Sequence, residues 1–234
     1  MTGAEAVVLD IEGTIGSLTF VREVLFPYSR GRLERFLQRD TPETQDVLTA
    51  TAELAGRPEA THADLVAILS DWLDQDRKAP PLKALQGMIW ADGYSSGELI
   101  AHVYRDVPAA LRIWRADGIA VHLFSSGSVQ AQHDWLRHTE VGDLRPLIDR
   151  LFDAQAVGAK TDPAAYHRIS REIGSAADRI LFASDRPAEL DAASAAGWHT
   201  LGVHRPENPA TDFGAHPWIT DFSWVRSRLA ETPA

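Results

Sequence analysis

Two acidic residues, Asp10 and Glu12, lie two positions apart in the sequence Asp-Ile-Glu-Gly-Thr at residues 10–14. The apolar run at residues 6–9 precedes them and indicates a buried strand that ends in a polar, glycine-containing loop. Asp10 could attack a phosphorus atom to form an aspartyl-phosphate, while Glu12 protonates the leaving oxygen and later activates water. The competing interpretation is a polar loop whose acids cap a helix, and the pentapeptide alone does not decide between them.

A second polar group follows the apolar run at residues 120–124, where Ser125 and Ser126 precede Gly127. Their hydroxyls and the nearby backbone N–H groups could hold phosphate oxygens at the start of the next helix. They could also simply cap that helix, which is predicted at residues 129–137. The two roles are compatible.

One lysine, Lys160, stands in the short loop sequence Gly-Ala-Lys-Thr-Asp-Pro ahead of a predicted helix. A fixed positive charge at this point could bind and stabilise a phosphoryl group. A single lysine usually faces solvent. Lys160 is therefore a candidate only as one member of a set with the polar groups described above.

A third acidic group, Asp185, follows the apolar run at residues 179–183, with Glu189 and Asp191 a little further on. Carboxylates gathered at strand ends favour a hard ion such as Mg²⁺. That ion would let anionic Asp10 approach an anionic phosphate. Glu189 and Asp191 could instead be favourable charges in the first turn of a helix, an interpretation that is stronger for Asp191 than for Asp185. Whether either of them joins the metal site stays open.

Short apolar runs and helix signals alternate along most of the chain. Two helices, at about residues 108–118 and 187–197, are bracketed by a proline near the start and a glycine at the end. Strands alternating with helices predict an α/β fold with a doubly wound, mostly parallel, Rossmann-like sheet. Because ligands bind beyond the carboxyl ends of such strands, Asp10, Ser125 and Asp185 are expected at that edge. The predicted strands cover residues 6–9, 120–124, 151–153, 179–183 and 200–203.

The stretch from Phe20 to Val103 breaks this alternation, because it shows helical periodicity and no convincing strand. Its apolar residues at positions 65, 68, 69, 72 and 73 fall on one face of a helix. The sequence therefore predicts two domains. An α/β catalytic core comprises residues 1–19 and 103–234, and an inserted all-helical cap comprises residues 20–102.

Composition narrows the classes of protein that the chain could represent. A formal net charge of −10 argues against broad binding to nucleic acid or to anionic membranes, which needs a basic surface. The sequence has no apolar run of about 18 residues and no basic, apolar leader at its start. With no cysteine, thiolate chemistry and cysteine-ligated metals are excluded. A cytoplasmic location is the expectation.

In their order along the chain, these residues resemble the haloacid dehalogenase superfamily. The resemblance rests on Asp-Ile-Glu-Gly-Thr at 10–14, Ser125, Lys160, and Asp185 followed by Glu189. Longer strings are similar to the enolase-phosphatases of the methionine salvage pathway. These strings cover residues 10–14, 19–28, 86–94, 96–99, 102–104 and 125–129.

The resemblance implies a Mg²⁺-dependent, monomeric enzyme that acts on a small phosphorylated substrate. Such an enzyme enolises 2,3-diketo-5-methylthiopentyl-1-phosphate and then removes the phosphate. The product is the acireductone 1,2-dihydroxy-3-keto-5-methylthiopentene. The implied catalytic residues are Asp10, Glu12 and Lys160; the implied substrate-binding residues are Ser125, Ser126 and Lys160; the implied metal ligands are Asp10, Glu12 and Asp185.

Two departures from the family pattern bear on substrate preference rather than on the reacting groups. Ile15 and Gly16 follow Thr14 where the family commonly has a threonine-rich tract, and Ala165-Tyr166 stand where it often has Ser-Tyr.

Two alternative functions and the identity of one base stay open. The alternative functions are a phosphatase for another small phosphate ester and, from a different class, a receiver-like phospho-accepting switch. The long helical insert counts against the switch. The base for enolisation is also open between Glu12 and Glu98.

Overall fold

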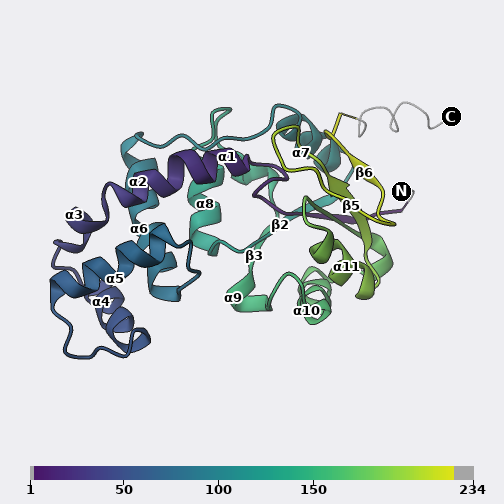
Figure 1. Ribbon diagram of the computed structural model, residues 1–234. Coiled ribbons are helices and arrows are strands. Elements are labelled where there is room, and N and C mark those ends of the chain that lie inside the picture. The colour runs from purple at the N-terminus through teal and green to yellow at the C-terminus, as the bar shows by residue number, and fades with distance from the viewer. Residues whose placement is uncertain (1–2, 224–234) are drawn as a thin grey trace. The chain divides into compact units, whose positions relative to one another are not determined.

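The computed structural model of the chain describes residues 3–223 (Figure 1). It contains two compact units, one built from residues up to Leu18 and from Ile100 onward, the other from Thr19–Leu99. The first boundary between the units lies at 18/19, one residue before the predicted 19/20. The second lies at 99/100, three residues before the predicted 102/103. Assignment of the units as catalytic core and cap stays a proposal.

The strands within residues 3–223 form one six-stranded sheet in the order β3-β2-β1-β4-β5-β6. Every neighbouring pair is parallel, so the predicted parallel sheet is confirmed. The central strand β1 is apolar at all four positions and buried at all four, as expected for a strand covered on both faces. The strands are β1 (Ala6–Leu9), β2 (Ala120–Ser125), β3 (Arg150–Asp153), β4 (Ile180–Ser184), β5 (His199–Val203) and β6 (Trp218–Ile219).

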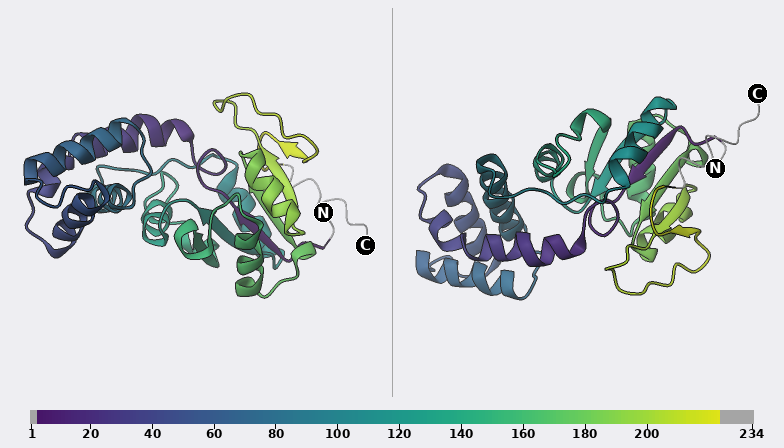
Figure 2. Two further views of the ribbon diagram at one scale, coloured as in Figure 1. Left: turned by 60° about the horizontal axis from the view of Figure 1, so that its bottom comes forward. Right: turned by 90° about the horizontal axis from the view of Figure 1, so that it is seen from above.

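Helices cover both faces of this sheet (Figure 2). One face packs against helices α9 to α11 through a cluster that includes Phe124, Tyr166 and Phe182. Helices α7 and α8 pack on the other side, where they contact β2 and β3. The bounds are α7 (Val107–Ala116), α8 (Val129–Arg137), α9 (Ala154–Val157), α10 (Pro163–Ile173) and α11 (Pro187–Ala195), with short 3-10 turns η2 (Arg145–Leu147) and η3 (Ala177–Arg179).

Prolines and glycines set the limits of these helices. Pro163 and Pro187 stand in the first turns of α10 and α11, where a missing N–H costs no hydrogen bond. Gly174 ends α10 in the left-handed conformation at φ 81°. The side chain of Asp162 accepts a hydrogen bond from the Ala164 N–H and caps the start of α10. The segment 159–162, which carries Lys160, is thereby anchored to the beginning of this helix.

Helices joined by short loops make up the unit Thr19–Leu99. Its core includes Leu65, Leu69, Trp72 and Leu73 from the predicted apolar stripe, while Ile68 is only partly buried. Capping boxes at Thr41 and Thr61 begin its two 13-residue helices. The helices, with the short α1 that leads into them, are α1 (Leu18–Phe20), η1 (Val21–Leu25), α2 (Phe26–Arg30), α3 (Leu33–Leu37), α4 (Pro42–Leu54), α5 (His62–Asp74) and α6 (Pro80–Ser96).

No helix in residues 3–223 is both long enough and apolar enough to span a bilayer.

Candidate active site

The candidate site lies where three neighbouring parallel strands end. Asp10 follows β1, Ser125 is the last residue of β2, and Asp185 follows β4. Leu9 pairs with Leu123 on one side and with Ala183 on the other, so the carboxyl ends of these strands fall at one level. The register therefore brings Asp10 together with polar residues that are more than 100 positions away from it in the sequence.

Asp10 is a buried carboxylate held at both oxygens. It is only 4% exposed. Its Oδ1 is ion-paired with the Lys160 ammonium, and its Oδ2 accepts a hydrogen bond from the Thr14 hydroxyl at 3.2 Å. A carboxylate fixed in this way is oriented before any substrate arrives, as nucleophilic attack requires.

Lys160 lies between two acids, Asp10 and Glu189. Its Nζ is 2.6 Å from Glu189 Oε2, and it also lies 5.8 Å and 5.9 Å from the centres of the Phe124 and Phe182 rings. Burial disfavours the charged ammonium, but the two carboxylates outweigh it and raise the pKa of Lys160 above its ordinary value. Lys160 is therefore a permanent cation at this edge of the sheet.

Glu189 and Asp185 carry negative charge that the surroundings do not fully balance. Burial, together with the charge of Asp10, raises the pKa of Glu189, although the Ser184 hydroxyl donates to its Oε2 at 2.9 Å. Burial and then the charges of Asp10 and Glu189 raise the pKa of Asp185 to about 7. The Asp185 Oδ1 atom is buried and has no hydrogen-bond partner among the described residues.

The loop after β1 turns sharply at Gly13, which has φ +78°. A Cβ atom there would collide with the Asp185 carboxylate and would lie 3.1 Å from Asn208 Nδ2. Glycine thus satisfies both the left-handed backbone and the close approach of Asp185. The Thr14 hydroxyl accepts a hydrogen bond from the Asp185 N–H at 3.0 Å, which links this loop to the end of β4.

The other sequence-predicted residues differ in their placement. Ser125 is buried, and its Oγ accepts from the Gly127 N–H at 3.0 Å. Glu12 and Ser126 are exposed on the loops that follow β1 and β2. Asp191 is also exposed and pairs with His216 at 3.1 Å, so its carboxylate is engaged elsewhere.

Glu98, the second candidate base for enolisation, belongs to the helical unit. Its Oε2 accepts hydrogen bonds from the Tyr28 hydroxyl at 2.9 Å and from Arg32 at 2.6 Å. These bonds lower the pKa of Glu98, which makes its carboxylate a weaker base.

Three residues of this site escape sequence reasoning. Ser184 donates to Glu189 and accepts from the Arg186 N–H at 3.1 Å. The Tyr166 hydroxyl lies 2.7 Å from the Lys160 carbonyl and 3.0 Å from the Glu189 carbonyl. Thr14 is visible in the pentapeptide, but only its contacts show that it holds Asp10. The sequence signals for Tyr166 are its position six residues after Lys160 and its match to the tyrosine of the family's Ser-Tyr pair.

The donor set fits a hard divalent cation. In the part of the chain that the structure describes, no three His, Asp or Glu side chains are already arranged around a common point that could hold a metal ion. However, Asp185 offers a buried Oδ1 without a partner among the described residues, and its pKa is raised by burial and then by the charges of Asp10 and Glu189. Oxygen ligands with surplus negative charge are what Mg²⁺ binds.

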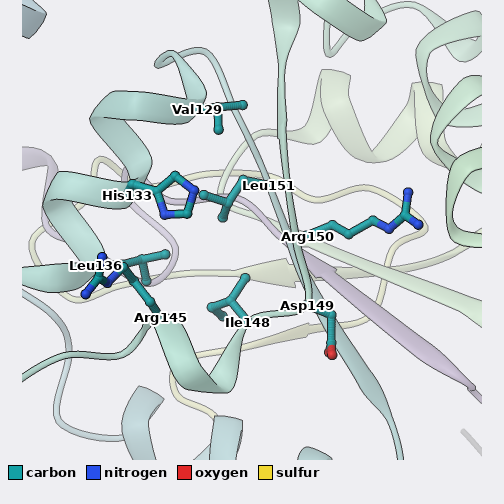
Figure 3. Close-up of a pocket in the computed structure, with 8 residues that line it drawn as sticks. All are labelled: Val129, His133, Leu136, Arg145, Ile148, Asp149, Arg150 and Leu151. Atoms are coloured by element: carbon teal, nitrogen blue, oxygen red, sulfur yellow. The ribbon is translucent and has the colours of Figure 1, made fainter.

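A separate hollow of about 140 Å³ lies between α8 and the segment leading into β3 (Figure 3). His133 and Leu151 face each other across it. None of the predicted site residues lines it. The lining residues are Val129, His133, Leu136, Arg145, Ile148, Asp149, Arg150 and Leu151.

Comparison with known proteins defines the class to which this fold and this site belong. Residues 4–197 match the family model of the haloacid dehalogenase-like hydrolases. The crystal structure of the UTR4 protein from Saccharomyces cerevisiae superimposes with a TM-score of 0.79 at 34% identity, covering 94% of this chain and 99% of that one. CbbY from Rhodobacter sphaeroides, in complex with xylulose-(1,5)bisphosphate, shares the fold with a TM-score of 0.63 at 16% identity, covering 94% and 95%.

Curated relatives narrow the class further. A protein from Streptomyces avermitilis named Enolase-phosphatase E1 is 49% identical over 212 residues, covering 90% of this chain and 89% of the relative. A protein of the same name from Nocardia farcinica is 44% identical over 229 residues, covering 97% and 98%. The chain belongs to the haloacid dehalogenase-like hydrolases and, within them, to the family of these enolase-phosphatase E1 proteins.

Proposed function

We propose that the protein is an enolase-phosphatase of methionine salvage, which converts 2,3-diketo-5-methylthiopentyl-1-phosphate to the acireductone 1,2-dihydroxy-3-keto-5-methylthiopentene and phosphate. The observation that carries the phosphatase step is the buried Asp10 carboxylate, oriented by Thr14 and paired with Lys160. The names of the relatives and the sequence strings shared with the family support the enolisation step and the substrate.

Asp10 acts as the nucleophile in this proposal. One of its carboxylate oxygens forms a bond to phosphorus while the bond from phosphorus to the substrate oxygen breaks. Glu12 gives a proton to that leaving oxygen. A water molecule then attacks the phosphorus, Glu12 takes up its proton, and the bond to Asp10 breaks to release phosphate.

Lys160, Ser125 and Ser126 bind the phosphoryl group. The ammonium of Lys160 is already directed at Asp10 and can stabilise charge on the phosphoryl oxygens as the bond to Asp10 forms. The Ser125 Oγ accepts from the Gly127 N–H, so its own hydroxyl hydrogen can donate to a phosphoryl oxygen.

Mg²⁺ is the cofactor of the proposed enzyme, held by Asp10, Glu12 and Asp185. When bound, the ion neutralises charge between the nucleophile and the phosphate. Asp185 supports this assignment because it offers a buried carboxylate oxygen without a partner in the described structure.

A monomeric enzyme in the cytoplasm completes the proposal. The resemblance to the enolase-phosphatases supports the oligomeric state, and the composition of the chain supports the location. Size-exclusion chromatography coupled to light scattering should give one copy of the 25.7 kDa chain. A stable dimer would contradict the monomer.

The Asp10→Asn variant tests the phosphatase step. Because an amide is a poor nucleophile, we expect phosphate release to fall by at least about 1,000-fold while the circular dichroism spectrum stays unchanged. Acireductone absorbance and phosphate release should be followed together in the unmodified protein. Substantial turnover by the variant would exclude Asp10 as the nucleophile.

The same assay separates the alternative functions. Phosphate release without acireductone would favour a phosphatase for another small ester. A stable phosphoprotein that does not turn over would favour the receiver-like switch.

A further inference from the structure

The segment that follows β5 reaches the loop that follows β1. Arg205 is 2% exposed, and its Nε donates to the Thr14 carbonyl at 2.9 Å. Asn208 is 8% exposed, and its Nδ2 donates to the Gly13 carbonyl at 3.0 Å. Two side chains from this segment therefore hold two consecutive carbonyls of the loop beside Asp10.

Arg205 is itself held rigidly. Its Nη1 lies 3.0 Å from both carboxylate oxygens of Asp106, and Asp106 Oδ2 also accepts from the Phe222 N–H at 2.7 Å. The guanidinium stacks over the Tyr104 ring at 4.1 Å. A buried arginine fixed at a carboxylate, a ring and a carbonyl has little freedom to move.

The position of Thr14 matters because its hydroxyl orients Asp10. Thr14 is fully buried, and its Oγ1 donates to Asp10 Oδ2 and accepts from the Asp185 N–H. A shift of the Thr14 backbone would move this hydroxyl away from the carboxylate oxygen that it holds. Errors of about 1 Å in the placement of reacting groups can lower rates by about 100-fold.

We propose that Arg205 and Asn208 are positioning residues, which fix the backbone at Gly13 and Thr14 so that the Thr14 hydroxyl stays bonded to Asp10 Oδ2. The inference rests on the proposed function, since it assigns these side chains a part in phosphoryl transfer. In the described structure neither residue is hydrogen-bonded or ion-paired to Asp10, so both act through the backbone that carries Thr14.

The first test compares Asn208→Ala and Arg205→Lys with the unmodified protein. We expect kcat for phosphate release to fall by about 10- to 100-fold, with KM changed less than about twofold. The control is Ser170→Ala, which removes the 2.8 Å hydrogen bond from Trp198 Nε1 far along the chain from this loop and should leave kcat unchanged. Unchanged kcat in both test variants would overturn the proposal.

A double-mutant cycle tests whether the effect passes through Thr14. In a Thr14→Val background, Asn208→Ala should lower kcat by less than about twofold, because the hydroxyl that it positions is already gone. A further fall of the full 10- to 100-fold in that background would overturn the proposed route through Thr14.

Amide hydrogen exchange gives a readout that needs no turnover. Peptides covering residues 11–17 should exchange at least about tenfold faster in Asn208→Ala than in the unmodified protein. Their exchange rate should be unchanged in Ser170→Ala. Unaltered exchange would overturn the proposal. If the unmodified protein released no phosphate but this difference were seen, the proposed function would be wrong. The fixing of the Gly13 and Thr14 backbone by Asn208 would still be supported.

Discussion

At the scale of single residues, Lys160 balances more than one negative charge. Its ammonium is paired with Asp10 and with Glu189, and all three side chains are at most 6% exposed. Paired charges in such a place are tolerated only because each has a partner. Lys160 therefore balances the acids around it, and in the proposed function it also binds the substrate phosphate.

Replacement of Lys160 by methionine should affect both properties. Because two buried carboxylates lose their partner, we expect the free energy of unfolding at pH 7.5 to fall by about 3–5 kcal/mol. We also expect kcat/KM for phosphate release to fall by at least about 100-fold. Urea unfolding and steady-state kinetics measure the two effects.

The control for this variant is Lys78→Met. The Lys78 side chain is 64% exposed, is ion-paired with Asp76 and lies 5.6 Å from the centre of the Phe26 ring, so its loss should change stability by less than about 1 kcal/mol. If Lys160→Met were as stable and as active as Lys78→Met, the assignment of Lys160 to the site would be wrong.

Asp185 provides the test of the proposed Mg²⁺ site. Since its raised pKa reflects burial among other carboxylates, a divalent cation should relieve the repulsion. We expect Mg²⁺ at about 100 times its Kd to stabilise the unmodified protein by about 2.7 kcal/mol, and EDTA to abolish both this gain and the activity. Asp185→Asn should lose most of the Mg²⁺-dependent rise in Tm.

Asp191→Asn is the matched control, because Asp191 pairs with His216 and its side chain is 76% exposed. It should keep the full rise in Tm. An equal response to Mg²⁺ in both variants, or full turnover in EDTA, would contradict a metal site at Asp185.

The sequence predicts where a polar residue lies when that residue follows or ends a strand. Asp10, Ser125 and Asp185 each come directly after an apolar run or at its end, and the parallel register then fixes their common edge. Ser184 and Tyr166 could not be predicted, because their partners are set by how α10 and α11 pack beside the sheet. No local pattern encodes such contacts.

At the scale of elements, strand β2 carries a polar group into the core. His122 is 3% exposed, its ring lies 6.1 Å from that of Phe152, and neither ring nitrogen has a hydrogen-bond partner among the described residues. Burial lowers the pKa of His122 to about 4, although Asp149 acts in the opposite direction. The imidazole is therefore neutral in the folded protein at pH 7.

This buried histidine makes stability depend on pH. Below about pH 6.5 the unfolded chain binds a proton at His122 that the folded chain does not bind until about pH 4, so stability falls as pH falls through this range. Between pH 7.5 and pH 5, the free energy of unfolding should fall by about 2 kcal/mol less in His122→Leu than in the unmodified protein. Urea unfolding at the two pH values measures the difference.

His167, which is exposed on α10, supplies the control. His167→Gln should lose as much stability over this pH range as the unmodified protein. The prediction is wrong if His122→Leu behaves in the same way as His167→Gln.

Helices could be predicted where proline and glycine at the ends of a segment bracket apolar residues within it. The sequence predicts the helices at residues 108–118 and 187–197 from proline and glycine, and the structure has α7 and α11 there. Strand β6 escaped prediction because Trp218–Ile219 is only two residues long and gains its place by pairing with β5. A strand of that length has no periodicity to detect.

At the scale of the whole molecule, the described residues of each unit include a hydrophobic core of their own. One lies between the sheet and helices α9 to α11, and the other lies within Thr19–Leu99. A long segment without strands interrupts the βαβ pattern of the sequence and predicts the helical insert. Residues 100–104, which follow this segment, are not helical in the structure.

Each core should stabilise mainly its own unit. Leu69 and Leu190 are both 0% exposed, one in each core, so Leu69→Ala and Leu190→Ala form a matched pair. Each change should cost about 2–5 kcal/mol through lost burial and the cavity left behind. Native-state hydrogen exchange should show loss of protection within residues 19–99 for Leu69→Ala, and within the α/β unit for Leu190→Ala. Equal loss of protection across the whole chain in both variants would show instead that the two cores unfold as a single cooperative unit.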